Sequence, residues 1–223
     1  MAYVYHPPTL TVDIVIFQVI GGKLHVLLIK RTNEPFKDVL ALPGGYNAAG
    51  DTTHQAMDRV LQSKVGLSSA DFSLIEQLYA FDTVARDPRG HAVSIVYMAL
   101  GNNLVCKESE TTQSPAFYPV DGLPDLAFDH KDIIHYAVER LRARIASTTA
   151  VFALLPEDFT LTQLQTAYEA VLGRKLDKRN FRKKFLSFDV LEPTDKYYQE
   201  GAHRPALLYR FKERKIQPLL RDF

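Results

Sequence analysis

Positively charged side chains are densest near the end of the chain, where seven lie within eleven residues and only Asp177 opposes them. An isolated charge run is usually a solvated surface. A cluster on one helix can instead neutralise the phosphates of a nucleic acid. The seven residues are Arg174, Lys175, Lys178, Arg179, Arg182, Lys183 and Lys184.

Three arginines in the first half of the chain lie in loops rich in Pro, Gly and charged residues. They are Arg31, Arg86 and Arg89. A guanidinium group matches phosphate or pyrophosphate through paired donors, so these arginines could hold a small phosphorylated ligand. Alternatively, Asp82 or Asp87 pairs with them and they only shape a loop or a subunit interface.

Loop residues beside these arginines could complete such a ligand site. Gly44 and Gly45 either let the backbone approach a ligand closely or only form a turn. Phe36 and Tyr46 could stack on a base or ribose, although a single loop aromatic is more often packed against the protein.

Composition indicates a folded protein of one large or two small domains. The chain has 223 residues, of which 46% are hydrophobic and 24% charged. Cys106 is the only cysteine, so no internal disulfide can form and a reducing cytoplasm fits. No segment resembles a signal peptide or a membrane span, and no Cys/His cluster has zinc spacing. We predict a cytoplasmic protein with no membrane partner, metal or cofactor.

Charge divides the chain into two parts. Residues 1–148 hold 13 Lys/Arg and 16 Asp/Glu, a balance of −3, whereas residues 149–223 hold 14 and 10, a balance of +4. The two parts therefore have different electrostatic roles, and we predict two domains with these bounds.

Hydrophobic periodicity predicts an α+β first domain. Residues 31–50 are punctuated by Pro and Gly and are expected to form a loop. The predicted strands are 10–17 and 24–29, joined by a turn at 21–22, then 74–81 and 92–100; the predicted helices are 51–65 and 129–145.

The last 75 residues follow the order of a winged helix-turn-helix module. Thr160 can cap a helix over 161–171, and Gly173 can end it. A basic helix over 177–186 follows, with Phe181 and Phe185 inward. Short strands at 190–193 and 206–211 complete the pattern.

Residues 45–67 resemble the Nudix box, a pattern of 23 positions with one Gly, five residues, Glu, seven residues and then R-E-U-x-E-E-x-G-U, where U is aliphatic. The spacing matches throughout, and Asp51 stands at the first Glu. The three Glu positions that hold metal in Nudix hydrolases are Val60, Ser63 and Lys64 here. A Nudix metal site and catalytic residues are therefore not expected.

A Nudix domain without these carboxylates, followed by a basic winged helix, resembles the Nudix-related transcriptional regulator (NrtR) family along nearly the whole chain. Residues 11–13, 42–45, 86–90 and 176–184 are typical of it, as are 191–193 and 204–206. The resemblance implies an α/β/α sandwich with a mixed sheet and a homodimeric repressor on a palindromic operator in double-stranded DNA. It also implies an effector, which is ADP-ribose or a sugar phosphate.

Specific residues are predicted for each site. The effector site comprises Arg31, Gly44, Gly45, Arg86 and Arg89. The DNA site comprises Thr160, Thr162, Arg174, Lys178, Arg179, Asn180, Arg182, Lys183, His203 and Arg204. Asn180 could pair with adenine and Arg182 with guanine or phosphate, while the lysines neutralise phosphates. Thr160 could equally be only a helix cap, and Asn180 could only cap or face solvent.

Two other functions stay open. One is a hydrolase of nucleoside diphosphate derivatives that places metal ligands outside the box, using Asp51, Asp58, Glu76 or Asp82. The other is a non-catalytic module whose basic end binds RNA or a protein. RNA reading usually needs exposed aromatic side chains, and the phenylalanines of the basic helix have the spacing of a core stripe.

Overall fold

A hairpin opens the fold. The computed structural model describes residues 6–108, 113–199 and 205–219. Strands β1 (Thr9–Ile20) and β2 (Lys23–Lys30) pair antiparallel around Gly21 and Gly22. Both glycines have positive φ, 57° and 77°, as a tight hairpin turn requires. The predicted hairpin is confirmed.

Further strands join the hairpin in one mixed sheet: β3 (Leu40–Ala41), β4 (Gly44–Tyr46), β5 (Leu74–Phe81), β6 (Ala92–Leu100) and β7 (Gln113–Pro119). The main path runs β3-β2-β1-β6-β5, with β4 beside β1 and β7 beside β2. β1 and β6 are parallel, and the other pairs are antiparallel. The strands predicted at 74–81 and 92–100 are confirmed.

The expectation of a loop over residues 31–50 is wrong for β3 and β4. Strands of two and three residues show no periodicity, and Pro43 and Gly44 are residues that usually interrupt strands. They pair nevertheless, because the Ile14 N–H donates to the Pro43 carbonyl at 2.9 Å and Gly44 lies opposite Asp13. The sequence also gave no prediction for β7, whose two prolines argue against a strand.

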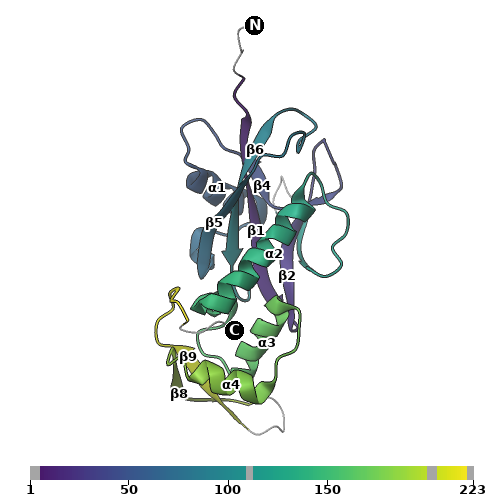
Figure 1. Cartoon of the computed structure of the whole chain (residues 1–223). Coiled ribbons are helices and arrows are strands. Elements are labelled where there is room, and N and C mark those ends of the chain that lie inside the picture. Colours follow the sequence, from purple (N-terminus) through teal and green to yellow (C-terminus); the bar gives the residue numbers. More distant parts are fainter. Residues whose placement is uncertain (1–5, 109–112, 200–204, 220–223) are drawn as a thin grey trace.

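Helices α1 (Thr53–Val65) and α2 (His130–Ser147) cover opposite faces of this sheet. Alternate residues of β1 separate the two layers, because Ile14 and Ile16 pack with α1 whereas Val15 and Phe17 pack with α2. Figure 1 shows α2 crossing one face obliquely, with α1 behind the strands. The predicted α/β/α sandwich with a mixed sheet is confirmed.

Helix ends follow from their capping residues. In α1, Thr52 forms a capping box with Gln55, so the helix begins two residues later than the expected 51, and Gly66 ends it with φ of 66°. Helix α2 runs to Ser147, two residues beyond the expected 145. A short 3₁₀ turn, η1 (Ser69–Asp71), precedes β5.

The end of the chain forms the predicted winged helix-turn-helix. Its elements are η2 (Thr149–Leu154), α3 (Leu161–Leu172), α4 (Lys178–Leu186), β8 (Leu191–Tyr198) and β9 (Ala206–Phe211). Phe181 and Phe185 of α4 pack on Tyr168 of α3, with ring centroids 5.4 and 5.6 Å away. The inward phenylalanines predicted from the spacing are confirmed.

The two parts of the chain share one hydrophobic core that runs from the α2 face of the sheet into α3 and α4. The Tyr168 hydroxyl donates to the Ile145 carbonyl at 3.1 Å, and Arg142 Nε donates to the Val171 carbonyl at 2.9 Å. Figure 1 shows the winged helix below the sheet, with α3 beside the end of β2. Helix α2 thus touches both parts. In the described part of the chain, every helix is too short or too polar to cross a membrane.

Candidate functional site

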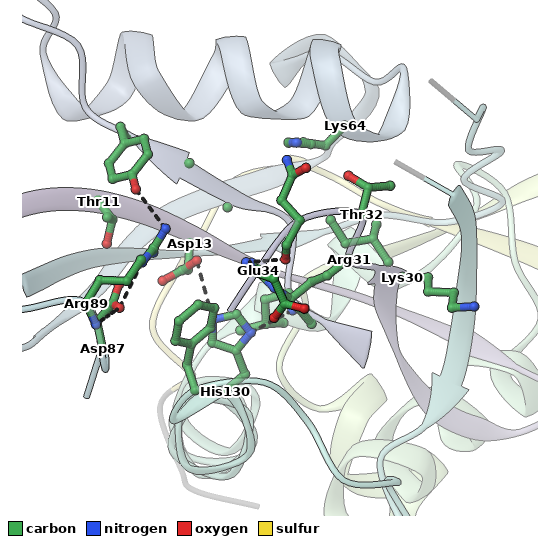
Figure 2. A pocket seen from close by; sticks show the side chains of 18 of the residues that line it. Thr11, Asp13, Lys30, Arg31, Thr32, Glu34, Lys64, Asp87, Arg89 and His130 are labelled. Carbon is green, nitrogen blue, oxygen red and sulfur yellow. Dashed lines mark hydrogen bonds and ion pairs between the residues drawn. The ribbon is translucent and has the colours of Figure 1, made fainter. Parts of the chain in front are cut away.

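A pocket of about 240 Å³ opens at the ends of the strands, between α1 and the first turn of α2. Figure 2 shows Lys64 on the α1 side, His130 on the α2 side and Arg89 with Asp87 at one end. All five residues predicted for the effector site line it, although they come from three separate segments: Arg31, Gly44, Gly45, Arg86 and Arg89. The structure therefore brings the predicted set together.

Arg86 lines the pocket, but its guanidinium group already binds carboxylates of the protein. Its side chain is only 4% exposed and binds both carboxylate oxygens of Asp129, at 2.8 and 2.9 Å. A second carboxylate, Asp13, lies 3.5 Å away. Burial lowers the pKa of Arg86, but the hydrogen bond to Asp129 and the charge of Asp13 outweigh it and raise that pKa. Arg86 thus ties strand β1 to the start of α2.

Asp13 and His130 extend this buried network. Ser94 donates to Asp13 Oδ2 at 2.6 Å. The Leu42 N–H donates to His130 Nδ1 at 2.9 Å, which places the ring proton on Nε2, 3.6 Å from Asp13 Oδ1. Burial lowers the pKa of His130 and favours this neutral form. Neither Asp13 nor His130 is among the residues predicted for the site; the available signal is the Asp13 carboxylate within the apolar run 10–17.

The two glycines serve the protein's own packing. A Cβ atom on Gly44 would lie 2.0 Å from Asp13 Oδ1, and one on Gly45 would lie 3.1 Å from a Val60 methyl group. Gly44 therefore makes room for the Asp13 carboxylate. This role differs from both roles considered for it above, close approach to a ligand and formation of a turn. Both glycines still line the pocket.

Arg31 and Arg89 leave donors facing the pocket. Arg89 pairs with Asp87 at 2.7 Å and donates to the Tyr46 hydroxyl at 2.8 Å, and its side chain is 43% exposed. Arg31 donates to the Pro35 and Asn33 carbonyls, and no described carboxylate lies within ion-pair distance of it. Burial and the charge of Arg89 lower its pKa.

Aromatic rings flank both guanidinium groups. Arg31 lies over the Phe128 ring at 4.7 Å, and Phe36 meets the same ring edge-on at 4.9 Å. Arg89 lies 5.7 Å from the centroids of both Tyr46 and Phe128. Phe128 has a φ of 55°, which is unfavourable for a bulky side chain and holds its ring at the pocket. Sequence reasoning missed Phe128 because no local pattern marks it.

The carboxylates proposed for a hydrolase are dispersed. Asp51 pairs with Arg59 at 3.0 Å, Asp58 with His54 at 3.4 Å and Glu76 with Arg144 at 2.6 Å, while Asp82 lies on an exposed loop. In residues 6–108, 113–199 and 205–219 no three His, Cys, Asp or Glu side chains gather in a way that could hold a metal ion.

The basic helix α4 lies at the far end of the molecule from the Nudix-like sheet (Figure 1). Most of the predicted DNA residues around it are exposed: Arg174, Lys178, Arg179, Asn180 and Lys183. Its N-cap is Asp177, whose side chain accepts from the Asn180 N–H at 2.8 Å. The exposed cations form a continuous candidate surface for phosphates.

The remaining predicted DNA residues differ in their surroundings. Arg182 Nη2 donates to the Thr162 hydroxyl at 3.0 Å, so this guanidinium is held between α4 and α3. Thr160 is 5% exposed, and its side chain accepts from the Gln163 N–H at 3.1 Å. It therefore caps helix α3, which was the alternative to DNA contact. His203 and Arg204 lie outside the described residues.

Comparison with protein families matches both parts of the chain. The NUDIX domain model covers residues 7–137, and the NrtR DNA-binding winged helix domain model covers residues 151–211. The fold, the pocket and the basic helix thus define a class of protein in which a Nudix domain is joined to a DNA-binding winged helix domain.

Similar proteins share this two-part organisation. The ADPR responsive transcriptional repressor NtrR of Acinetobacter baylyi is 39% identical over 213 residues, covering 93% of this chain and 83% of that protein. Shewanella oneidensis NrtR complexed with a 27mer DNA superposes with a TM-score of 0.82 at 32% identity, covering 96% of this chain and 99% of that one. The chain belongs to the NrtR family of Nudix-related transcriptional regulators.

The first domain also matches by itself. The NUDIX domain of Shewanella oneidensis NrtR complexed with ADP ribose superposes with a TM-score of 0.56 at 34% identity, over 61% of this chain and 90% of that chain. The part of the chain that carries the arginine-lined pocket is therefore the part that resembles an ADP-ribose complex.

Proposed function

We propose that this protein is a transcriptional repressor that binds a specific operator in double-stranded DNA and that ADP-ribose binding in its Nudix domain modulates DNA binding. The observation that carries the proposal is that one chain joins an arginine-lined pocket and an exposed basic helix through a shared core. Its relatives in the family are regulators. One of them is named as ADPR responsive, and the NUDIX domain of another was crystallised with ADP ribose. Residues 1–148 sense the effector, and residues 149–223 bind DNA.

Arg31 and Arg89 are the residues best placed to bind the pyrophosphate. Both carry guanidinium groups at the pocket wall, and Arg31 has no carboxylate partner among the described residues. Tyr46 and Phe128 already flank the Arg89 guanidinium, so an adenine or ribose would pack beside these rings or displace the guanidinium from them. Arg86 acts indirectly, because its guanidinium is engaged by Asp129 and Asp13. A sugar phosphate would use the same cations but leave the aromatic faces empty.

The recognition helix of the proposed DNA complex is α4. The exposed side chains of Lys178, Arg179 and Lys183 neutralise phosphates, and Asn180 reads a base edge. Arg182 is oriented by Thr162, which pre-arranges its free donors for a base or phosphate. Thr160 contributes as a cap. His203 and Arg204 remain a proposal from sequence, as does a homodimer that matches the two-fold symmetry of a palindromic operator.

A Lys183→Gln substitution should weaken binding to operator and unrelated DNA alike. One phosphate contact fewer lowers the slope of log affinity against log salt by about one unit. Fluorescence anisotropy titrations at several salt concentrations measure this slope. The matched control is Lys131→Gln on the exposed first turn of α2, whose slope should equal that of the native protein. Equal salt slopes for the two variants would show that Lys183 does not contact DNA phosphates.

Coupling between the sites runs through α2. This helix begins beside the pocket at the Asp129 and His130 network and ends against α3 through the Ile145 and Tyr168 contact. An effector can release DNA only if it binds the DNA-free arrangement more tightly. A small shift of α2 would change the spacing of two recognition helices in a dimer, which must fit half-sites about 34 to 36 Å apart or a multiple of that.

Hydrolase activity receives no support from the positions of the carboxylates. Val60 is in the core, Ser63 faces solvent, and Asp51, Asp58 and Glu76 pair with basic side chains elsewhere. We therefore assign the Nudix domain to effector binding. Phosphate released from ADP-ribose, measured with Mg²⁺ or Mn²⁺ and a coupled phosphatase, should equal the protein-free background.

Selection of genomic fragments from the source organism tests sequence-specific binding. The purified protein retains fragments at fixed moderate salt, and the retained DNA is sequenced, since any basic module binds DNA at low salt. A short palindrome upstream of a few genes is the expected result. Uniform recovery without a shared site would contradict the repressor proposal and favour a non-specific binding module. The cytoplasm is the compartment this function requires.

A further inference from the structure

The Nudix fold implies a divalent metal beside the diphosphate, but the residues present here do not fit one. Of the three former carboxylate positions on α1, Val60 is 2% exposed within the core and Ser63 faces solvent. No cluster of three His, Cys, Asp or Glu side chains with metal-binding geometry occurs in the described parts of the chain. The third position, Lys64, is a cation and would repel a metal ion.

Carboxylates that do line the pocket are largely used by the protein itself. Asp13 accepts from Ser94 and faces Arg86 and His130. Asp87 accepts two side-chain hydrogen bonds and one backbone hydrogen bond from Arg89. A metal ion recruited to either carboxylate would have to displace cationic donors that already hold it. Glu34 is the third pocket carboxylate, and a Mg²⁺ ion held by it alone would depend on the ligand phosphates and water for all its other positions.

Lys64 lies where it can supply positive charge instead. It projects from α1 into the pocket, and Figure 2 shows it across from the loop that carries Arg31 and Glu34. Arg31 and Lys64 line the same pocket, and burial together with the charge of Arg31 lowers the pKa of Lys64. Two cations held close together in this way favour an anionic ligand between them.

Cationic side chains are the commonest charged groups in the pocket lining. Five cationic side chains line it, against three carboxylates. Lys30 is held by Asp38 at 3.0 Å and Arg86 by Asp129 at 2.8 Å, both outside this lining, so the positive charge offered to a pyrophosphate comes from the remaining cations of the lining. The cationic side chains are Lys30, Arg31, Lys64, Arg86 and Arg89.

We propose that Lys64 takes the place of the divalent metal, so that its ammonium group binds the effector pyrophosphate and ADP-ribose binds without any metal ion. The inference rests on the proposed function and deepens it. The residue that stands at a metal-ligand position thus supplies the charge that the metal would have supplied, and an ammonium group cannot bind and activate a water molecule as a divalent metal does.

Calorimetric titration of ADP-ribose into the full-length protein tests this inference. For the native protein the dissociation constants in excess EDTA and in millimolar MgCl₂ should agree within about twofold. Loss of one charge-assisted contact in Lys64→Gln should weaken binding about tenfold in both buffers. Lys64→Arg should retain most of the affinity because it keeps the charge. Lys131→Gln, which removes an exposed lysine outside the pocket, should bind as the native protein does.

The outcomes separate this inference from the proposed function. Native affinity that falls tenfold or more in EDTA would overturn the inference, as would native-like binding by a Lys64→Gln variant. Either result would leave ADP-ribose as the effector. A native protein that does not bind ADP-ribose in either buffer would instead overturn the proposed effector, and the inference with it. Thermal melting of each variant checks that a lost affinity does not come from unfolding.

Discussion

Replacing Arg86 by alanine should lower the free energy of unfolding by about 3 kcal/mol. The substitution leaves Asp129 and Asp13 without their shared cation, and both carboxylates are largely buried, with side chains 14% and 8% exposed. Removal of one partner from a buried pair is costly because the other charge remains desolvated. Urea denaturation followed by circular dichroism measures the change.

Arg89→Ala is the matched control for this prediction, since it removes an arginine from the same loop. Its guanidinium is 43% exposed although Asp87 is only 9% exposed, so loss of this pair should cost about 1 to 2 kcal/mol, less than loss of the buried Arg86 pair. The two variants should therefore differ in kind: Arg86→Ala loses more stability, whereas Arg89→Ala loses less stability and more affinity for ADP-ribose. A native urea midpoint for Arg86→Ala would show that the network around α2 is not structural.

Replacing Gly44 by alanine should also cost about 3 kcal/mol of stability, through steric overlap and loss of a buried contact. The added Cβ would lie 2.0 Å from Asp13 Oδ1 and 3.1 Å from the Val12 carbonyl. Asp13 cannot move away freely, because Ser94 holds its other oxygen at 2.6 Å. Thermal and urea unfolding measure the cost, and the variant should also bind ADP-ribose less tightly because the pocket wall is displaced.

The neighbouring glycine provides the comparison. A Cβ on Gly45 would meet only a Val60 methyl group at 3.1 Å, which can shift by a few tenths of an ångström. Gly45→Ala should therefore cost about 1 kcal/mol. Both glycines lie in β4, so the two variants change strand propensity equally. Equal stability of the two variants would mean that Asp13 does not require the space above Gly44.

Regular elements with long patterns were predictable from the sequence. The strands at 74–81, 92–100 and 206–211 have the expected bounds, because each is a run of apolar residues ended by turn residues. The helices differ from expectation only by one or two residues at their ends. Strands β3, β4 and β7 could not be predicted well, since they are short or contain proline and form only because a longer strand lies beside them.

The candidate site was predictable by residue type but not by role. Arg86 and Arg89 lie three residues apart in one loop, and the sequence treats them alike. Their roles differ because Asp129, 43 residues away, reaches only Arg86. Phe128 was missed for a similar reason, since its contribution depends on a backbone conformation with positive φ rather than on a pattern.

We propose that ADP-ribose binding in the Nudix domain controls operator binding by α4. Fluorescence anisotropy of a labelled operator palindrome, titrated with ADP-ribose at fixed salt, tests it most directly. ADP-ribose should release the DNA from the native protein, and Arg89→Ala should bind the DNA normally but need about tenfold more ADP-ribose to release it. Operator that stays fully bound at ADP-ribose concentrations shown by calorimetry to saturate the pocket would contradict the account.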